Sequence, residues 1–314
     1  MRPTIAVVVP MLNAAQDLDA LFSSLSNQKF DKPWEIVAVD NGSDDGTADI
    51  ARALLQSSRH VNLVRSEVVT VESPQGYATP RNAGVRATTA PFIAFCDADG
   101  AVDDYWLDAI TGSLQEHRLV ASRKFRSNDV SRRDEKTVWS EQRELFTILD
   151  ETFAATAGLG CTRELFDALG GFDTCFNSGG EDADFSFRAR FQLGVEPHME
   201  LAAVYWSKVP SRYTKAISIG FRDVRTEFLL YQRHLGRNLQ SPLGLSAIRR
   251  SLKLFTYRLL RLHRWNTERR VEFAREAGCL IGRMVWSVKF GAWYFRTRSS
   301  RKAAVGDEGA SNAS

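Results

Sequence analysis

Short apolar runs alternate with amphipathic segments along the first hundred residues. Four runs are predicted to form strands: Ile5 to Val9, Glu35 to Val39, Val61 to Val64 and Phe92 to Cys96. Helical spacing predicts helices between them, over Leu18 to Leu25 with Asn13 as the N-cap, over Thr47 to Gln56, and over Asn82 to Thr88. Strands and helices that alternate through short loops predict an α/β fold, a mostly parallel sheet flanked by helices.

The pattern is mixed over roughly 101–220 and then becomes long and helical. Helices are predicted over Trp106 to His117, Lys136 to Asp150 and Ala183 to Leu193, with a short strand over Leu201 to Trp206. Apolar residues then recur at spacings of three and four, which predicts one helical seam: Leu245, Ile248, Leu252, Phe255, Leu259 and Leu262. A second helix is expected from about Thr267 to Phe295, and the tail 303–314 is predicted to be disordered.

The composition is that of an ordinary globular protein. Hydrophobic residues make up 44% and charged residues 25% of the 314 positions, which excludes a disordered chain, a collagen and a small disulfide scaffold. The four cysteines are scattered without a C-x-x-C pair, which fits a reducing compartment and speaks against a zinc site. No stretch of 18 uncharged apolar residues occurs, so no transmembrane helix is expected.

Polar residues follow three of the predicted strands where these strands end. They lie in the segments Pro10 to Asn13, Asp40 to Asp45 and Asp97 to Asp99. Ligands of open α/β sheets bind beyond the carboxyl ends of the strands. Asp97 and Asp99 can both reach one divalent cation, since hard cations such as Mg²⁺ or Mn²⁺ prefer oxygen ligands. A polar turn without a ligand is the alternative.

The segment after the second strand combines a candidate ligand contact with a turn. Asp40 directly follows a hydrophobic run and is expected to hydrogen-bond a base or a ribose at the sheet edge. Gly42 and Gly46 allow the backbone to turn, and Asp44 or Asp45 is a candidate cap for the following helix.

An arginine and two adjacent carboxylates complete the candidate chemistry. Arg81 either pairs with a phosphate or organises nearby carboxylates, and a surface arginine beside an N-cap Asn82 is the alternative. Glu181 and Asp182 follow two glycines and precede a predicted helix. A helix cap is a strong alternative for either one alone, but two occur together on a loop, and a loop carboxylate is the group that can deprotonate a hydroxyl nucleophile.

These motifs, taken together and in this order, resemble the family 2 glycosyltransferases with the GT-A fold. The resemblance covers about residues 4–215. It rests on V-V-P-x-x-N-A, V-D-N-G-S-D-D-G-T, R-N-A-G, F-C-D-A-D-G, and G-G-x-D followed by G-G-E-D-A-D-F-S-F-R. No single motif is specific, whereas the combination is.

The resemblance implies an inverting enzyme of hexosyltransferase type that moves a sugar from a nucleotide-sugar to an acceptor hydroxyl. In such enzymes the residue matching Asp40 contacts the nucleotide base, which favours a UDP-sugar here. The residues matching Asp97 and Asp99 bracket the diphosphate and its divalent cation, Mg²⁺ or Mn²⁺. The carboxylate matching Asp182 is the usual general base, with Glu181 as the competitor. The donor-binding positions expected here are Pro10, Asn13, Asp40, Asn41, Gly42, Arg81 and Asp97.

Two positions depart from the family pattern. Many relatives place a His after the late strand as a further metal or phosphate contact, whereas Trp206 stands there in this chain. Waters or the diphosphate are then expected to fill the coordination sphere. Pro80 is also unusual immediately before Arg81.

The C-terminal helices are strongly basic, which the resemblance does not explain. The whole chain has a net charge of +3, but residues 245–302 hold 15 Lys and Arg against 3 Asp and Glu, a net of +12. Basic amphipathic helices with aromatic residues bind anionic membrane surfaces. Packing on the catalytic domain with a solvated basic face is the alternative, and nucleic acid is a rival that the catalytic motifs disfavour.

Four parts follow from these patterns. Residues 1–100 are expected to form the nucleotide-sugar-binding half of a GT-A domain and 101–220 its acceptor-binding half. Residues 221–302 are expected to form a basic amphipathic helical extension, followed by the disordered tail. The predicted protein is cytoplasmic and peripheral at the inner face of the membrane. It acts on a glycan or lipid-linked acceptor in polysaccharide or glycolipid synthesis, with no nucleic acid partner.

Two other functions are weighed against this one. A non-catalytic nucleotide-sugar-binding or membrane-scaffold protein on the same fold is disfavoured because both the D-x-D sequence and Glu181-Asp182 are present. A nucleotidyltransferase is disfavoured because it needs a Gly-, Arg- or Lys-rich loop after the first strand, which Pro10 to Ala14 does not supply.

Overall fold

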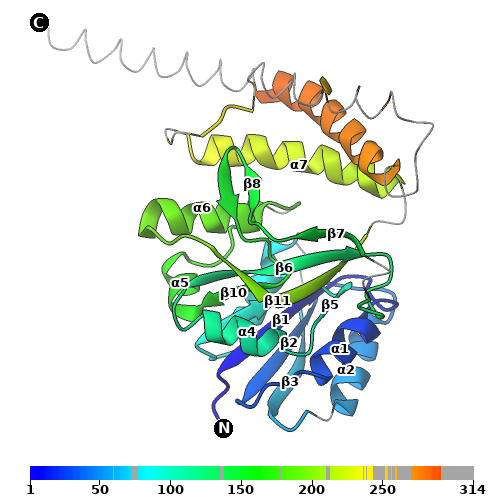
Figure 1. Ribbon diagram of the computed structural model, residues 1–314, viewed down its shortest axis with the longest axis vertical. Coiled ribbons are helices and arrows are strands. Elements are labelled where there is room, and N and C mark those ends of the chain that lie inside the picture. The colour runs from blue at the N-terminus through cyan, green and yellow to red at the C-terminus, as the bar shows by residue number, and fades with distance from the viewer. Residues whose placement is uncertain are drawn as a thin grey trace, which may run out of the picture. The chain divides into compact units, whose positions relative to one another are not determined.

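The chain forms two compact units in the computed structural model, an N-terminal unit, Met1–Val209, and a C-terminal unit, Pro210–Ser314 (Figure 1). The structure describes residues 1–58, 60–71, 76–134, 138–176, 178–209, 213–235, 237, 239–242, 252, 253, 256, 259 and 270–290. No helix among these residues is long and apolar enough to cross a membrane.

A mixed sheet forms the centre of the N-terminal unit. Its first part is parallel, in the order β3 (Leu63–Thr70), β2 (Trp34–Asp40), β1 (Ile5–Met11) and β4 (Phe92–Phe95). It continues through β10 (Leu159–Thr162), β6 (Leu119–Ser127), β11 (His198–Lys208) and β5 (Gly100–Val102), with β7 (Val138–Gln142) paired to β6. Strand β10 runs antiparallel to both of its neighbours, and a separate hairpin joins β8 (Phe146–Ile148) to β9 (Glu151–Phe153).

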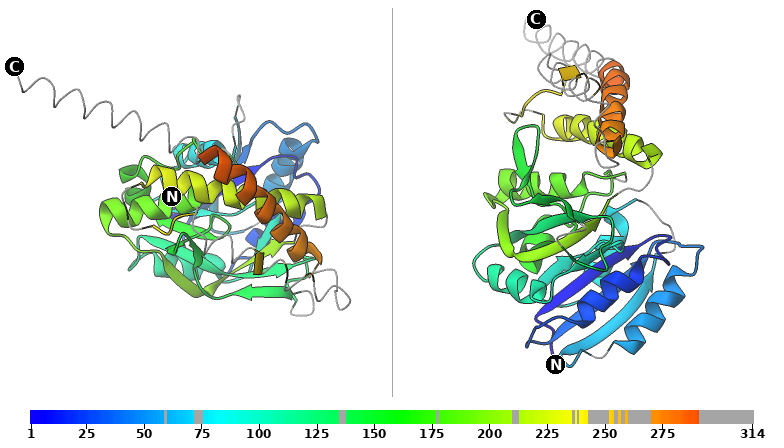
Figure 2. Two further views of the ribbon diagram at one scale, coloured as in Figure 1. Left: turned by 90° about the horizontal axis from the view of Figure 1, so that it is seen from above. Right: turned by 45° about the vertical axis from the view of Figure 1, so that its right-hand side comes forward.

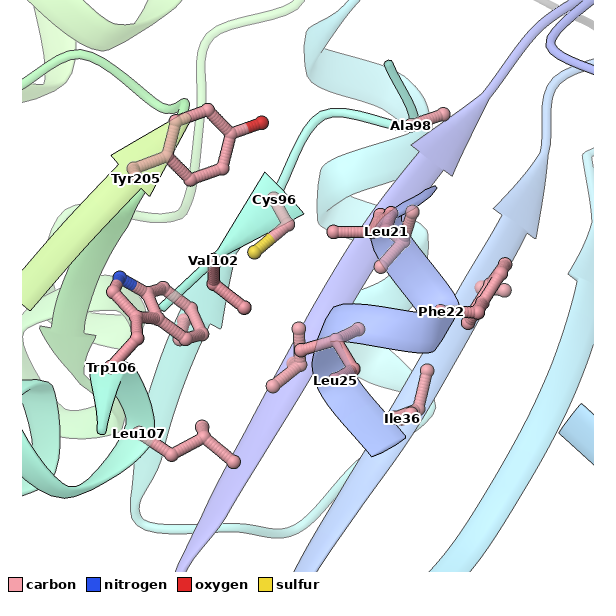
Figure 3. Close-up of a cluster of buried hydrophobic side chains, with 14 of the residues drawn as sticks. Leu21, Phe22, Leu25, Ile36, Cys96, Ala98, Val102, Trp106, Leu107 and Tyr205 are labelled. Atoms are coloured by element: carbon pink, nitrogen blue, oxygen red, sulfur yellow. The ribbon is translucent and has the colours of Figure 1, made fainter. Parts of the chain in front are cut away.

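Helices cover both faces of this sheet, which explains the continuous apolar run of β1. Alternate side chains of a strand point to opposite faces. Ile5, Val7 and Val9 pack with α1 (Leu18–Ser26), α2 (Thr47–Ser57) and α4 (Trp106–Ser113). Figure 3 shows Leu25 of α1 and Trp106 of α4 in this cluster. Ala6 and Val8 pack with α3 (Ala78–Arg86), α5 (Arg163–Ala168) and α6 (Glu181–Leu193). Figure 2 shows α1 and α2 on one face of the parallel strands.

A glycine allows α3 to lie directly against the sheet. A Cβ atom at Gly84 would stand 2.4 Å from Cγ1 of Val8 and 3.1 Å from Cγ2 of Val39, closer than packed atoms allow. The glycine of the R-N-A-G motif therefore sets the distance between α3 and strands β1 and β2. Arg81 lies one helical turn before Gly84 on α3, so this close packing also fixes its position.

The helix predicted over Lys136 to Asp150 is wrong. The described part of this segment, from Val138 onward, forms β7 and β8 instead. Strand β7 adds to β6 in antiparallel register, and Phe146 of β8 packs on Phe153 of β9 with ring centroids 5.7 Å apart. The sequence there is rich in β-branched and aromatic residues, and the end of β6 beyond its pairing with β10 supplies a partner for β7.

The prediction of Asn13 as a helix cap is also wrong. Helix α1 begins at Leu18, and its N-cap, Asp17, lies four residues after Asn13. Asn13 has a φ of 49°, and its side-chain oxygen accepts a hydrogen bond from the Asp44 backbone N–H at 3.0 Å. Its own backbone N–H donates to the Ser43 hydroxyl at 3.0 Å, so Asn13 ties the loop after β1 to the loop after β2.

The C-terminal unit contains α7 (Tyr213–Arg233) and a helix over 270–290 packed against it (Figure 1). Gly220 and Gly278 allow the two backbones to touch, since a Cβ at either one would fall within 2.0 Å of a carbonyl oxygen of the other helix. Arg275 pairs with Asp223 at 2.6 Å. The second predicted helix is thus present over 270–290.

Most of the predicted seam over 245–262 lies outside the described residues, as does the predicted disordered tail 303–314. The two seam residues that the structure describes, Leu252 and Leu259, are helical and exposed.

Candidate active site

The loops after β1, β2 and β4 emerge at one edge of the sheet. Met11 and Asp40, the last residues of β1 and β2, are register partners, and Phe95 at the end of β4 pairs with Val8. Because parallel strands end at the same edge, the three polar segments predicted from sequence are brought together. Asp45 stabilises the loops that follow β1 and β2, because its carboxylate accepts hydrogen bonds from the backbone N–H groups of Thr47 and Ala15.

The β2 segment places two buried polar side chains at the edge. Asp40 and Asn41 are both buried, and the Ser43 backbone N–H lies 3.4 Å from each carboxylate oxygen of Asp40. The Asn41 amide nitrogen donates to the Gly76 carbonyl at 3.2 Å, while its Oδ1 has no hydrogen-bond partner among the described residues. Gly42 has a φ of 83°, which requires glycine. A buried acceptor left unpaired is costly, so a ligand that donates a hydrogen bond to it would be bound favourably.

Pro10 lies one residue before the end of β1, in register with Val39 of β2, and is half-buried. Together with Asn13 it shapes the loop that borders Asp40. The donor-binding positions predicted from the first two motifs therefore lie side by side.

Arg81 is the centre of the site. It is 3% exposed, and its Nη2 donates to Oδ1 of Asp97 while Nη1 donates to Oε1 of Glu181, both at 2.7 Å. Burial by itself lowers the pKa of Arg81, but the charges of Asp97 and Glu181 outweigh it and raise that pKa above the ordinary value. The alternative of a surface arginine is therefore wrong. Both terminal nitrogens are engaged by carboxylates, which favours an organising role over direct phosphate binding.

Glu181 and Asp182 begin α6, and neither is its cap. The N-cap is Gly180, with a φ of 96°. Glu181 is buried, its Oε2 has no partner among the described residues, and burial raises its pKa to about 7 despite the opposing charge of Arg81. Asp182 accepts from the backbone N–H of Thr156 at 3.3 Å and of Ala183 at 2.9 Å, and burial raises its pKa as well. A buried carboxylate with a raised pKa suits proton transfer near neutral pH.

The D-x-D segment forms a tight turn that hydrogen bonds to the Tyr205 hydroxyl hold in place. The Asp97 backbone N–H donates to the Tyr205 hydroxyl at 3.1 Å, and that hydroxyl donates to the Asp97 carbonyl at 3.3 Å. A Cβ at Gly100 would stand 1.9 Å from the same hydroxyl, so the motif's glycine is needed for this contact. Tyr205 belongs to the core cluster that also contains Cys96 and Ala98 (Figure 3).

The carboxylate oxygens of the D-x-D turn fit a divalent cation that a bound ligand also coordinates. Asp97 and Asp99 supply carboxylate oxygens, and 36% of the Asp97 side chain is exposed. The described residues contain no group of three or more His, Cys, Asp or Glu side chains arranged to hold a metal. Trp206 is structural, since its indole N–H donates to Asp103 at 2.7 Å and its ring stacks on Phe125. Two protein carboxylates leave room for diphosphate and water oxygens.

Lys124 is a site residue that the sequence reasoning missed. It lies on β6, in register with Tyr205 of β11, and is only 8% exposed. Burial lowers its pKa, while Asp97, Asp182 and Asp99 act in the opposite direction. In the sequence it stands between Arg123 and Phe125, in the polar second half of the strand, and the register that brings it beside Tyr205 is not visible there.

Comparison with known proteins identifies the family. The model of glycosyl transferase family 2 matches residues 6–170. Glycosyltransferase AglE of Haloferax volcanii is 32% identical over 107 residues, which are 34% of either chain. The uncharacterized glycosyltransferase YibD of Escherichia coli is 30% identical over 98 residues, 31% of this chain and 26% of YibD. These matches span about a third or less of the relatives' length.

Solved structures share the fold over most of the chain. Mannosyltransferase PcManGT from Pyrobaculum calidifontis, in complex with GDP-Man and Mn²⁺, superposes with a TM-score of 0.60 at 19% identity, covering 92% of this chain and 88% of its own. TarS 1-349 of S. aureus, in complex with UDP, gives 0.53 at 17% identity, covering 93% and 92%. The predicted α/β fold of GT-A type is thereby confirmed. Since the family model also matches more than half of the residues, the chain belongs to glycosyl transferase family 2.

Proposed function

We propose that this protein is an inverting glycosyltransferase that moves a sugar from a nucleotide-sugar to an acceptor hydroxyl. The observation that carries the proposal is the bridge made by Arg81. It joins Asp97 of the D-x-D turn to Glu181, the neighbour of Asp182, through two hydrogen bonds of 2.7 Å. A group that binds a departing diphosphate and a candidate base are thus held in one site, as direct displacement at a sugar carbon requires.

The polar residues at the carboxyl end of β2 support a nucleotide-sugar as the donor substrate. The buried Asp40 carboxylate and the unpaired Asn41 oxygen are acceptors for the N–H and O–H groups of a base and a ribose. Structural neighbours were solved with GDP-Man, UDP and UDP-GlcNAc. Asp40 favours a pyrimidine, so we propose a UDP-sugar first and a GDP-sugar second.

The reaction follows from this arrangement. The acceptor hydroxyl attacks the anomeric carbon from the face opposite the diphosphate, and Asp182 takes its proton as the new C–O bond forms. The bond from the anomeric carbon to the diphosphate oxygen breaks, and its electron pair leaves with the nucleotide. A divalent cation held by Asp97 and Asp99 would neutralise the charge that develops on that leaving group. Arg81 keeps Asp97 and Glu181 fixed throughout.

The C-terminal unit supports a membrane-proximal acceptor, a glycan or lipid-linked hydroxyl. On the helix over 270–290, Ile281, Met284 and Val288 share one face, since they are spaced three and four residues apart. They are 46%, 60% and 74% exposed. Exposed apolar residues on a strongly basic segment fit binding to an anionic lipid surface, where each basic residue adds about 1 kcal/mol. We therefore propose that the protein acts at the inner face of the membrane.

The donor site is tested by the variant Asp99→Ala. UDP- or GDP-sugar with Mn²⁺ should raise the melting temperature of the wild-type protein, and EDTA should remove the effect. Asp99→Ala should abolish the cation-dependent shift while leaving the melting temperature of the free protein nearly unchanged, because the side chain lies on a partly exposed turn. Asp108→Ala, an exposed carboxylate on α4, is the matched control. A cation-dependent shift that persists in Asp99→Ala rules out the assignment.

The base is tested by Asp182→Asn. The amide retains the size of the side chain but cannot take the acceptor's proton, so kcat should fall by about 10²–10⁴-fold with donor affinity nearly unchanged. Steady-state kinetics and calorimetry measure the two quantities. Glu181→Gln is the comparison. Normal turnover in Asp182→Asn together with a collapse in Glu181→Gln would transfer the role of base to Glu181.

Membrane binding is tested by co-sedimentation with phosphatidylglycerol vesicles. The wild-type protein should bind at low salt and dissociate at 1 M salt, where the Debye length is about 3 Å. Replacing Ile281, Met284 and Val288 by Ser should weaken binding at least tenfold, whereas Val61→Ser, at an exposed apolar residue of the N-terminal unit, should have no effect. A wild-type protein that ignores the vesicles at low salt contradicts the membrane assignment.

A further inference from the structure

Lys124 is a buried residue whose ammonium group makes no hydrogen bond to the described residues. The residue is 8% exposed, and no hydrogen bond or ion pair joins it to any residue that the structure describes. Its nearest recorded contacts are aromatic, with Nζ 5.1 Å from the ring centroid of Phe146 and 5.8 Å from that of Tyr205. Cation–π contacts at these distances compensate only part of the cost of removing an ammonium from water.

The backbone places this ammonium beside the D-x-D turn. Lys124 of β6 and Tyr205 of β11 are register partners in a parallel pair, so their side chains lie on the same face of the sheet. The Tyr205 hydroxyl touches the backbone of Asp97. Lys124 therefore lies within the electrostatic field of Asp97, Asp99 and Asp182 without binding any of them directly.

The charges of the site indicate what Lys124 binds. Asp97 and Asp99 together carry two negative charges, which cancel the charge of one divalent cation. Arg81 is already engaged by Asp97 and Glu181. A nucleoside diphosphate gains one further negative charge when the bond to the sugar breaks, and the ammonium of a mostly buried lysine close to the turn can offset it.

We propose that Lys124 binds the donor, with its ammonium donating a hydrogen bond to an oxygen of the β-phosphate that departs with the nucleotide. This inference rests on the proposed function. Lys124 remains protonated through the reaction, because the acceptor's proton goes to Asp182 and the electron pair of the broken bond goes to the phosphate oxygen. The interaction strengthens as that oxygen gains charge, so it contributes to turnover as well as to binding.

The test compares Lys124→Met and Lys124→Arg with the wild-type protein by calorimetric titration with UDP and GDP in the presence of Mn²⁺. Lys124→Met should weaken diphosphate binding by about 10- to 100-fold, the usual effect of losing a hydrogen bond to a charged group. UMP, which has no β-phosphate, should bind both proteins equally. Lys124→Arg should recover part of the affinity. Lys208→Met, which removes a lysine from the exposed end of β11, should bind as the wild type does.

A melting measurement separates this role from a structural one. Methionine replaces a buried, unpaired charge with an apolar side chain of similar length, so Lys124→Met should melt at the same temperature as the wild type or higher. Unchanged UDP and GDP binding in Lys124→Met overturns the inference, as does an equal loss of UMP binding. Normal diphosphate binding with a raised acceptor KM would assign Lys124 to an anionic acceptor instead. A wild-type protein that binds no nucleoside diphosphate overturns the proposed function itself.

Discussion

The buried guanidinium of Arg81 is the interaction on which the site depends. It reaches Asp97 on one side and Glu181 on the other, residues that are 16 and 100 positions away in the chain. Removing one partner of a buried ion pair typically costs about 3–5 kcal/mol, because the other charge is left uncompensated. Three features place the guanidinium. They are the close packing of α3 at Gly84, the turn held by Tyr205, and the start of α6 at Gly180.

This bridge also determines the protonation chemistry around it. Glu181 keeps one oxygen on Arg81 and leaves the other unpaired, and burial raises its pKa to about 7. Asp182 lies beside it but is only partly buried, and it is held by backbone N–H groups rather than by the guanidinium. Two adjacent carboxylates thus differ in their partners, and the one without an ion pair is suited to exchange a proton with a substrate. Lys124 adds a positive charge that is influenced by Asp97, Asp99 and Asp182 but forms no ion pair with them.

Local signals in the sequence predict the elements but not their long-range partners. The two-faced apolar run of β1 and the polar residues at the strand ends are local, and both were predicted correctly. Strand β7 forms because it pairs with β6, and β8 forms because it pairs with β9; no local pattern reports either partner. Asn13 bonds to Asp44, 31 residues away, instead of capping a helix. Motifs identify Arg81 and Glu181 separately, whereas their contact and the place of Lys124 depend on helix packing and strand register.

The central claim is that Arg81 couples the D-x-D turn to the start of α6. A double-mutant cycle of Arg81→Lys and Glu181→Gln, read out as the dissociation constant of the nucleotide-sugar with Mn²⁺, tests it most directly. A lysine retains the charge but has a single nitrogen in place of the two terminal nitrogens with which Arg81 reaches Asp97 and Glu181. Glu181→Gln should therefore weaken donor binding in the wild-type background and have little further effect beside Arg81→Lys, with a coupling of at least about 1 kcal/mol. Effects that add to within about 0.5 kcal/mol would show that the two motifs act independently and would contradict the account.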